Sequence, residues 1–312
     1  MEPVRVLQER GVNPAIFYEN GNIHPAAEYA RRLATLREWA ASDDPAIVAP
    51  IPVVEGAYDP AAWEQVSGAI GDRAIDQARE LIARAEGGNA AGADGPAGPS
   101  GTATRPYKRK DEGGGSLPEP RGLTDEEALR VAAYREAIEG GADPEAAVTL
   151  AVDPALRETR CRLCYRARLE AAAAYAAENG FTAIGTTLSV SPYQYTEVIR
   201  EEVERAAAKA GLAPCFEDYR PFYDEATRRS RARGMYRQNN CGCRISDLEA
   251  QAERAQRKAR RARAKAAEAE AHAEERAAAE AERQAKRAER RAYNEKQARK
   301  RAILKAMREQ RE

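Results

Sequence analysis

The C-terminal residues 246–312 contain neither glycine nor proline, and this feature limits the fold more than any other part of the sequence. Alanine, glutamate, arginine and lysine make up most of the segment, and nearly all of these residue types are strong helix formers. Glu and Arg recur at spacings of three or four residues, which supports a long helix. Leucine is almost absent between Leu248 and Leu304, so a leucine-zippered coiled coil is not expected. We therefore expect a charged helical tail over 247–312, interpreted as a solvated single helix or, alternatively, as an RNA contact.

The distribution of charge separates this tail from the rest of the chain. The whole sequence has 50 basic and 50 acidic side chains, whereas residues 246–312 hold 20 Lys and Arg against 13 Asp and Glu. The tail therefore has a net charge of +7 and the remainder a net charge of −7. A polyanion would be attracted to the tail and repelled by the rest of the chain. No apolar run approaches the roughly 18 residues of a membrane span, and the N-terminus lacks the apolar core of a signal peptide. We expect a cytoplasmic protein.

Before residue 246, short apolar or β-prone runs alternate with helical patterns. The runs predict strands at 12–18, 47–54 and 181–188. Helices are predicted at 25–41, 58–69, 124–139, 160–179 and 194–210. This alternation predicts an α/β fold, with a mostly parallel sheet flanked by helices. The stretch 87–122 is rich in Gly, Pro, Ser and Ala, and we interpret it as a disordered linker.

Two of the expected helices carry start signals. Asp59 precedes Pro60, a plausible cap followed by a first helical residue. Thr124 is followed three residues later by Glu127, which is the spacing of a capping box.

Four of the five cysteines form two close pairs. In a reducing compartment such pairs favour metal binding or redox chemistry over structural disulfides. Cys161 and Cys164 have C-x-x-C spacing at a predicted helix start, so two thiolates can face one metal and the helix terminus lowers their pKa. Half of a zinc site is the structural alternative. Cys215 stands alone, and we interpret it as a buried small side chain.

The second pair, Cys241 and Cys243, is separated by one glycine. In an extended chain the two Cα atoms would lie about 7 Å apart, too far for easy bridging. Gly242 permits the tight turn that would bring the thiols together. A disulfide there would be strained and readily reduced. A pair of metal ligands is the alternative interpretation.

A series of short motifs runs in order along the chain. Its early part is Phe17-Tyr18-Glu19-Asn20-Gly21-Asn22-Ile23-His24-Pro25 and Tyr58-Asp59-Pro60-Ala61-Ala62-Trp63. Its later part is Cys161-x-x-Cys164-Tyr165, Arg168-Leu169-Glu170, Glu178-Asn179-Gly180-Phe181, Thr186-Thr187-Leu188, Ser191-Pro192-Tyr193 and Tyr236-Arg237-Gln238-Asn239-Asn240-Cys241-Gly242-Cys243. The series closely resembles the QueH-type epoxyqueuosine reductases, over roughly 4–73 and 158–246.

This resemblance implies an oxidoreductase of tRNA modification, which removes the epoxide oxygen of epoxyqueuosine at the wobble position to give queuosine. It implies that Cys161 and Cys164 are ligands of a 4Fe–4S cluster and that Cys241 and Cys243 form a redox-active disulfide. An additional iron with an open coordination position could act as a Lewis acid toward the epoxide oxygen. The implied partners are tRNA, through its anticodon loop, and an unidentified electron donor.

Five further side chains are candidates for substrate contact. His24, Tyr193 and Arg237 are candidates for proton supply or substrate binding, and Tyr18 or Tyr236 could stack on bases of the anticodon loop. Structural alternatives stay open for three of them. His24 could cap a loop, Tyr193 could pack, and Arg237 could pair with a carboxylate.

The chain departs from the family pattern in three places. The family's first strand and its adjacent Cys-Cys pair are absent, and the helical pattern of residues 4–11 resembles the end of the helix that follows them. We therefore expect the chain to begin downstream of the true start. We interpret 74–157 as an insertion that holds the linker and a helix, and 247–312 as an addition to a catalytic domain of 1–73 and 158–246. The alternative to an active enzyme is a non-catalytic RNA-binding or zinc-stabilised relic of the family.

Overall fold

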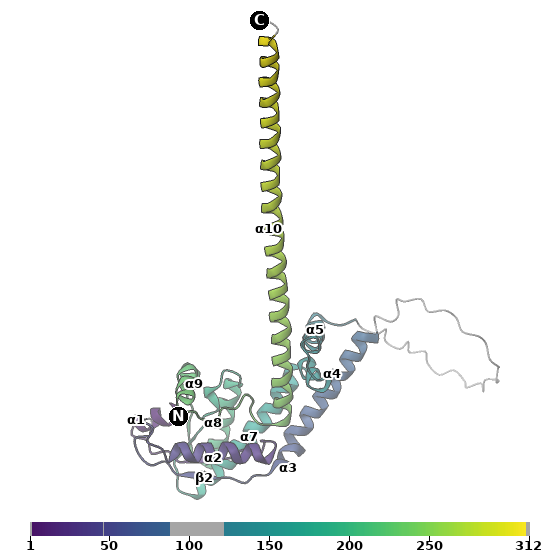
Figure 1. Ribbon diagram of the computed structural model, residues 1–312. Coiled ribbons are helices and arrows are strands. Elements are labelled where there is room, and N and C mark those ends of the chain that lie inside the picture. Colours follow the sequence, from purple (N-terminus) through teal and green to yellow (C-terminus); the bar gives the residue numbers. More distant parts are fainter. Residues whose placement is uncertain (1, 46, 88–121, 310–312) are drawn as a thin grey trace, which may run out of the picture. The chain divides into compact units, whose positions relative to one another are not determined.

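The computed structural model describes residues 2–45, 47–87 and 122–309. The chain divides into two units, Met1–Gln256 and Arg257–Glu312 (Figure 1). The disordered linker expected over 87–122 lies outside the described residues, apart from its two ends. Within the described ranges, no helix is both long and apolar enough to cross a membrane.

Most of the described chain is helical. The helices are α1 (Glu2–Glu9), α2 (Ala26–Ala40), α3 (Pro60–Trp63), α4 (Ala69–Gly87), α5 (Asp125–Glu139), α6 (Pro144–Val148), α7 (Pro154–Glu178), α8 (Thr196–Ala210), α9 (Tyr223–Ala232) and α10 (Arg244–Glu309). A π-helical segment, Glu64–Gly68, joins α3 to α4. Single 3-10 turns stand at Thr149–Ala151, Leu188–Val190 and Arg220–Phe222.

In the ranges that the structure describes, the strands form two separate parallel pairs, which corrects the expectation of one mostly parallel sheet. Strand β1 (Ile16–Tyr18) pairs with β2 (Val53–Glu55), and β3 (Ala183–Gly185) pairs with β4 (Ala213–Cys215). Parallel pairing itself is confirmed, but each strand is only three residues long. Proline explains part of the shortening, because it cannot donate a ladder hydrogen bond. The strand expected over 47–54 therefore begins only after Pro52, and Pro214, the central residue of β4, offers no N–H to the ladder.

Local cap signals placed two helix starts correctly. The Asp59 carboxylate accepts a hydrogen bond from the backbone N of Ala62 at 3.0 Å, and Thr124 forms a complete capping box with Glu127. Helix α7 begins earlier than the expected residue 160. Asp153 caps it, accepting from the backbone N of Ala155 at 2.8 Å. The C-x-x-C pair therefore lies well inside a helix, not at its start.

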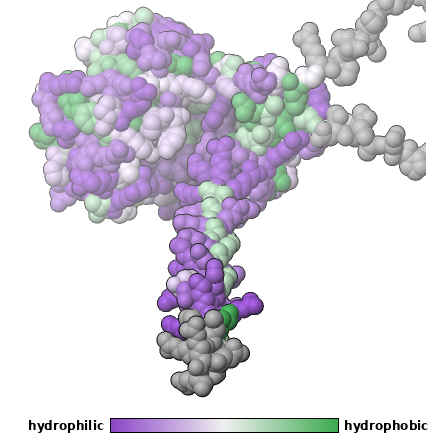
Figure 2. Space-filling view, turned by 90° about the horizontal axis from the view of Figure 1, so that it is seen from above, coloured by the Kyte–Doolittle hydropathy of each residue, from purple (hydrophilic) through white to green (hydrophobic). Residues whose placement is uncertain are grey.

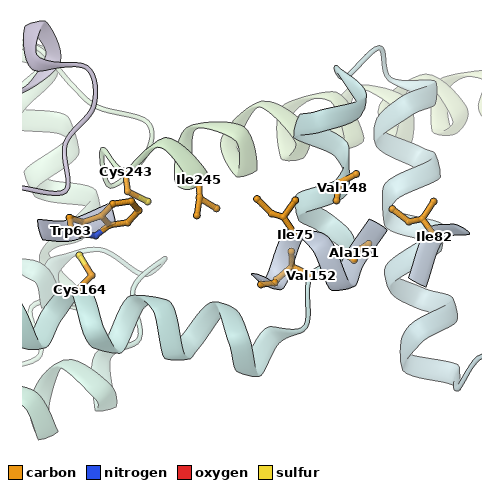
Figure 3. Packing of buried hydrophobic residues seen from close by; sticks show 11 residues of the cluster. Trp63, Ile75, Ile82, Val148, Ala151, Val152, Cys164, Cys243 and Ile245 are labelled. Carbon is orange, nitrogen blue, oxygen red and sulfur yellow. The ribbon is translucent and has the colours of Figure 1, made fainter. Parts of the chain in front are cut away.

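The main core of the first unit joins α4, the segment 146–152, α7 and the start of α10. Figure 3 shows side chains from all four parts packed together, and these include Trp63, Ile75, Ile82, Val148, Val152, Cys164, Cys243 and Ile245. Parts of the expected insertion at 74–157 thus belong to this core, although its assignment as an insertion in the family stays a prediction. A second cluster packs α7 against α8 and β3.

The first turns of α10 also belong to the first unit. Ile245 and Ala252 are fully buried, and Gln256 donates a hydrogen bond to Glu136 of α5 at 2.9 Å. The first unit therefore ends at Gln256, beyond the expected domain boundary at 246. Gly140, which follows α5, faces α10 so closely that an added Cβ would lie 1.9 Å from the carbonyl oxygen of Ala255.

We expect Gly140→Ala to lower the free energy of unfolding by about 1–3 kcal/mol, because the methyl group meets backbone and not a flexible side chain. Gly87→Ala is the matched control, since an added Cβ at Gly87 meets nothing within 4 Å. Urea denaturation followed by circular dichroism measures both. Equal stability of the two variants would contradict the close approach of α10 to Gly140.

Candidate functional site

All four paired cysteines line one small pocket, which we call the thiol pocket. Cys161 and Cys164 come from α7, and Cys241 and Cys243 come from the loop before α10. The other lining residues are Asn22, Trp63, Arg160, Tyr165, Arg168 and Gln194. Two cysteine pairs that are distant in sequence therefore face the same space, together with two guanidinium groups.

The α7 pair lies one helical turn apart, which places both side chains on one side of the helix. Cys164 is buried and Cys161 is half-buried. Burial raises the pKa of Cys161 to about 11, against the opposing charge of Arg160, and it also raises the pKa of Cys164. This corrects the expectation that a helix N-terminus lowers these values, because the pair lies inside α7.

The C-G-C pair is held as two free thiols in a tight turn. Gly242 has φ +108°, a conformation that favours glycine, and its carbonyl oxygen accepts from the backbone N of His24 at 2.8 Å. The turn brings the two Sγ atoms to 3.6 Å. Their hydrogen bond lowers the pKa of Cys241 and raises that of Cys243. The Sγ of Cys243 also accepts from the backbone N of Ser246 at 3.3 Å, so this thiol caps α10.

Trp63 lies between the two thiol pairs. Figure 3 shows its ring between Cys164 and Cys243, with the indole nitrogen turned toward Cys164. The side chain is buried, and its indole N–H interacts with the Cys164 thiol and favours the thiolate there, but it does not reach full hydrogen-bond geometry. Buried donors are normally satisfied, so this atom is available to a group bound in the thiol pocket.

Arg160 brings a buried positive charge to the same pocket. Its Nη2 donates to the Sγ of Cys161 at 3.5 Å and to Oε2 of Glu249, on α10, at 3.2 Å. Both Arg160 and Glu249 are buried. Burial disfavours the Arg160 charge, but the Glu249 carboxylate more than compensates and raises the pKa of Arg160. The start of α10 thus holds a cation against the thiols.

Arg168 and His24 tie the early loop to this region. Arg168 donates to the carbonyl oxygen of Glu19 at 2.8 Å and to Oδ1 of Asn20 at 2.6 Å. The His24 ring lies 6.0 Å from that of Trp63, and its Nε2 lies 3.6 Å from Oε1 of Glu64. The structure therefore places His24 beside the thiol pocket, although it is not one of the lining residues.

The remaining four candidate residues lie outside the pocket. Tyr18 is buried, and burial raises its pKa to about 12, so it presents no exposed stacking face. Tyr193 is 77% exposed. The ring of Tyr236 lies under the guanidinium of Arg31 at 3.7 Å. Arg237 donates to the Thr227 hydroxyl at 3.2 Å. Substrate-binding roles for these residues stay predictions.

Sequence reasoning did not select Trp63, Arg160 or Arg168 for this site. A signal was present for the two arginines. Arg160, Cys164 and Arg168 are spaced by four residues, so they share one side of a helix that spans all three. That spacing is informative only once α7 is known to begin at Pro154. The start of α7 had its own signal in Asp153-Pro154, which is the same cap and first helical residue as Asp59-Pro60.

Cysteine pairs that converge on one pocket beside arginine side chains are typical of proteins that use cysteine for metal binding or redox chemistry. The family model "Epoxyqueuosine reductase QueH" matches residues 1–79 and 133–249. The match covers more than half of the chain, which therefore belongs to the QueH family, and the resemblance found in the sequence is confirmed.

Two curated relatives support this family. Epoxyqueuosine reductase QueH of Dehalococcoides mccartyi is 33% identical over 90 residues, which is 29% of this chain and 50% of the relative. Epoxyqueuosine reductase QueH of Thermotoga maritima is 34% identical over 99 residues, which is 31% of this chain and 52% of the relative. The chain thus spans about half the length of the curated relatives that it matches.

Proposed function

We propose that this protein is an epoxyqueuosine reductase, which acts on tRNA that carries epoxyqueuosine and produces queuosine. The observation that carries the proposal is the convergence of two cysteine pairs and two arginines in one pocket of a QueH-family chain. Removal of the epoxide oxygen consumes two electrons and two protons. Both carbon–oxygen bonds break, a carbon–carbon double bond forms, and the oxygen leaves as water.

The C-G-C thiols are suited to supply these electrons. Oxidation of Cys241 and Cys243 to a disulfide releases two electrons and two protons, which balances the reduction of one epoxide. Their Sγ atoms lie 3.6 Å apart and must approach to about 2.05 Å to bond. A separate electron donor would then reduce the disulfide before the next cycle.

The thiol pocket is also chemically suited to the iron–sulfur cluster that the family resemblance implies. Cys161 and Cys164 would supply two of the roughly four thiolates that a cluster needs, although no three His, Cys, Asp or Glu side chains in the described residues form a ready metal site. Arg160 would offset the negative charge of bound thiolates. The indole N–H of Trp63, which has no well-formed hydrogen bond, could donate to a cluster sulfide or to the Cys164 thiolate. A bound cluster would supply electron relay and an iron that polarises the epoxide oxygen.

Proton delivery to the departing oxygen falls to His24 in this proposal. Its imidazole lies beside Trp63, and its Nε2 lies 3.6 Å from Oε1 of Glu64 without a hydrogen bond, so this nitrogen is open to a bound substrate. A histidine side chain can both accept and donate a proton, which is what delivery to the departing oxygen requires.

The rival candidate is a zinc-stabilised or RNA-binding relic of the family without catalytic activity. The observation that suits it is the C-x-x-C spacing of Cys161 and Cys164, because two thiolates at this spacing can also form half of a zinc site. Its metal would be a single zinc, so it predicts a colourless protein. An active enzyme would contain several irons and absorb visible light.

Anaerobic purification followed by metal analysis separates the two candidates. We expect iron in the wild-type chain and its loss in Cys161→Ala and Cys164→Ala, because each change removes one of the two α7 thiolates assigned as ligands. Cys215→Ala should keep its iron, since Cys215 lies in β4 and does not line the thiol pocket. Conversion of epoxyqueuosine in tRNA, measured by mass spectrometry of nucleosides, then tests the reaction. Equal iron in all three variants would remove the ligand assignment.

A further inference from the structure

The second unit is a helix whose charges are arranged in blocks. Residues 268–282 contain six Glu and one Arg, whereas residues 283–301 contain nine Lys and Arg and two Glu. Every side chain in 283–301 is exposed except Gln297, which is half-buried. The last block therefore concentrates positive charge on an accessible helix, and the distribution of that charge around the helix axis is uneven.

One face of this helix collects arginine. Arg283, Arg287, Arg290, Asn294 and Arg301 follow one another at spacings of four, three, four and seven residues. At about 100° per residue, these five side chains fall within an arc of about 60°. We call this set the arginine face. None of its arginines makes an ion pair with any described residue.

Carboxylates are kept away from this face. Glu289 and Glu295 project about 120° to either side of it. Alanines occupy much of the opposite side, among them Ala288 and Ala292, and Arg299 lies between these two. Figure 2 shows a pale green stripe of weakly hydrophobic residues along the described helix, between purple charged residues. An ordinary solvated helix would gain more from carboxylates interleaved with its arginines at i,i+4, so the segregation of charge needs another reason.

We propose that the arginine face binds the phosphate backbone of RNA, an inference that rests on the tRNA substrate of the proposed function. Guanidinium groups bind phosphate oxygens with two hydrogen bonds and keep their charge at any physiological pH. From Arg283 to Arg301 the face is about 27 Å long, enough for several successive phosphates. The proposed substrate is thus a polyanion, and the helix supplies four guanidinium groups and one amide along a single line for it.

Two other kinds of partner fit this face less well. A protein partner needs a buried aromatic or aliphatic anchor at the centre of the contact, and Tyr293, which lies about 80° off the arginine face, is the one large side chain with apolar surface in 283–301. A membrane surface needs a broad apolar side opposite the basic one, whereas this helix has alanines and the charged Arg299 there. RNA requires neither feature.

Two triple variants of the full chain test the proposal at equal net charge. Arg287→Gln, Arg290→Gln and Arg301→Gln together neutralise the arginine face, and Lys296→Gln, Arg299→Gln and Lys300→Gln together remove the same charge elsewhere on the helix. Glutamine is a good helix former, so both helices should persist. Binding of unmodified tRNA is measured at several salt concentrations. We expect the face variant to bind about tenfold or more weakly and to lose about two units of salt slope, and the control to change by less than about threefold.

Several results would overturn the proposal. Equal weakening by both variants would show that only net charge matters, and unchanged binding in both would show that this helix does not contact RNA. Poly-glutamate that binds the wild-type chain as tightly as tRNA would indicate a protein-type partner instead. Binding of unmodified tRNA includes no reductive step, so this experiment is independent of the proposed reaction. If the wild-type chain binds tRNA through the arginine face but does not reduce epoxyqueuosine, the proposed function is wrong and the proposal for the arginine face stands.

Discussion

Replacing either cysteine of the C-G-C turn by serine is expected to end multiple turnover while leaving iron in place. Serine cannot form a disulfide, so Cys241→Ser and Cys243→Ser remove the internal two-electron source. Neither variant should form more than about one queuosine per chain, because the remaining redox groups cannot be recharged through a disulfide. A quenched time course of queuosine per chain, with iron content measured on the same sample, checks this.

Cys215→Ser is the control for this experiment, because Cys215 is half-buried in β4 and lies outside the thiol pocket. It should turn over like the wild type. Loss of iron from Cys241→Ser or Cys243→Ser would show that the C-G-C pair ligates metal. Full turnover in either variant would show that the pair carries no electrons.

Glu249→Ala should produce the largest loss of stability of any single change considered for this chain. Removal of the carboxylate leaves Arg160 buried and charged, and Arg157 also loses its 3.3 Å hydrogen bond to Oε2. Breaking a buried ion pair from one side typically costs about 3–5 kcal/mol. Denaturant unfolding followed by circular dichroism measures the loss.

Two further variants decide whether the unpaired charge is the cause. Asp76→Ala removes an exposed partner of Arg79, and it should leave stability unchanged within error because both side chains are largely solvated. The double variant Arg160→Met with Glu249→Leu should recover most of the loss, because neither charge is then buried. A double variant as unstable as Glu249→Ala would indicate that lost packing, and not the charge, is responsible.

The parts of the fold that the sequence predicted well are those decided by neighbouring residues. The capping box of Thr124 and the Asp59 cap are local signals, and both helices begin where these signals lie. The strands were predicted too long because strand length depends on pairing partners, and prolines such as Pro52 remove donors from the ladder. The joining of strands into one sheet is a tertiary property that alternation alone cannot decide.

The candidate site shows the same division. The two cysteine pairs were recognisable from spacing, and the structure brings them into one pocket. The side chains around the cysteines were not recognisable from the sequence. Trp63, at the end of α3, and Glu249, on α10, are brought to the site by tertiary packing. The direction of the Cys161 pKa shift was missed for a related reason, since it follows from burial inside α7 and not from position in the sequence.

The π-helical segment Glu64–Gly68 has a consequence for how this site can change. It stands between Trp63, which faces the thiols, and the core face of α4, which includes Ala74 and Ala78. A π turn holds one residue more than an α turn, so it delays the rotation of the chain by about 100°. The direction of the Trp63 indole and the direction of the core face of α4 are therefore offset around the helix axis. Insertion or deletion of one residue in this segment would turn the indole relative to the thiols and leave the packing of α4 in place. The segment therefore separates the position of the indole in the site from the packing of the core.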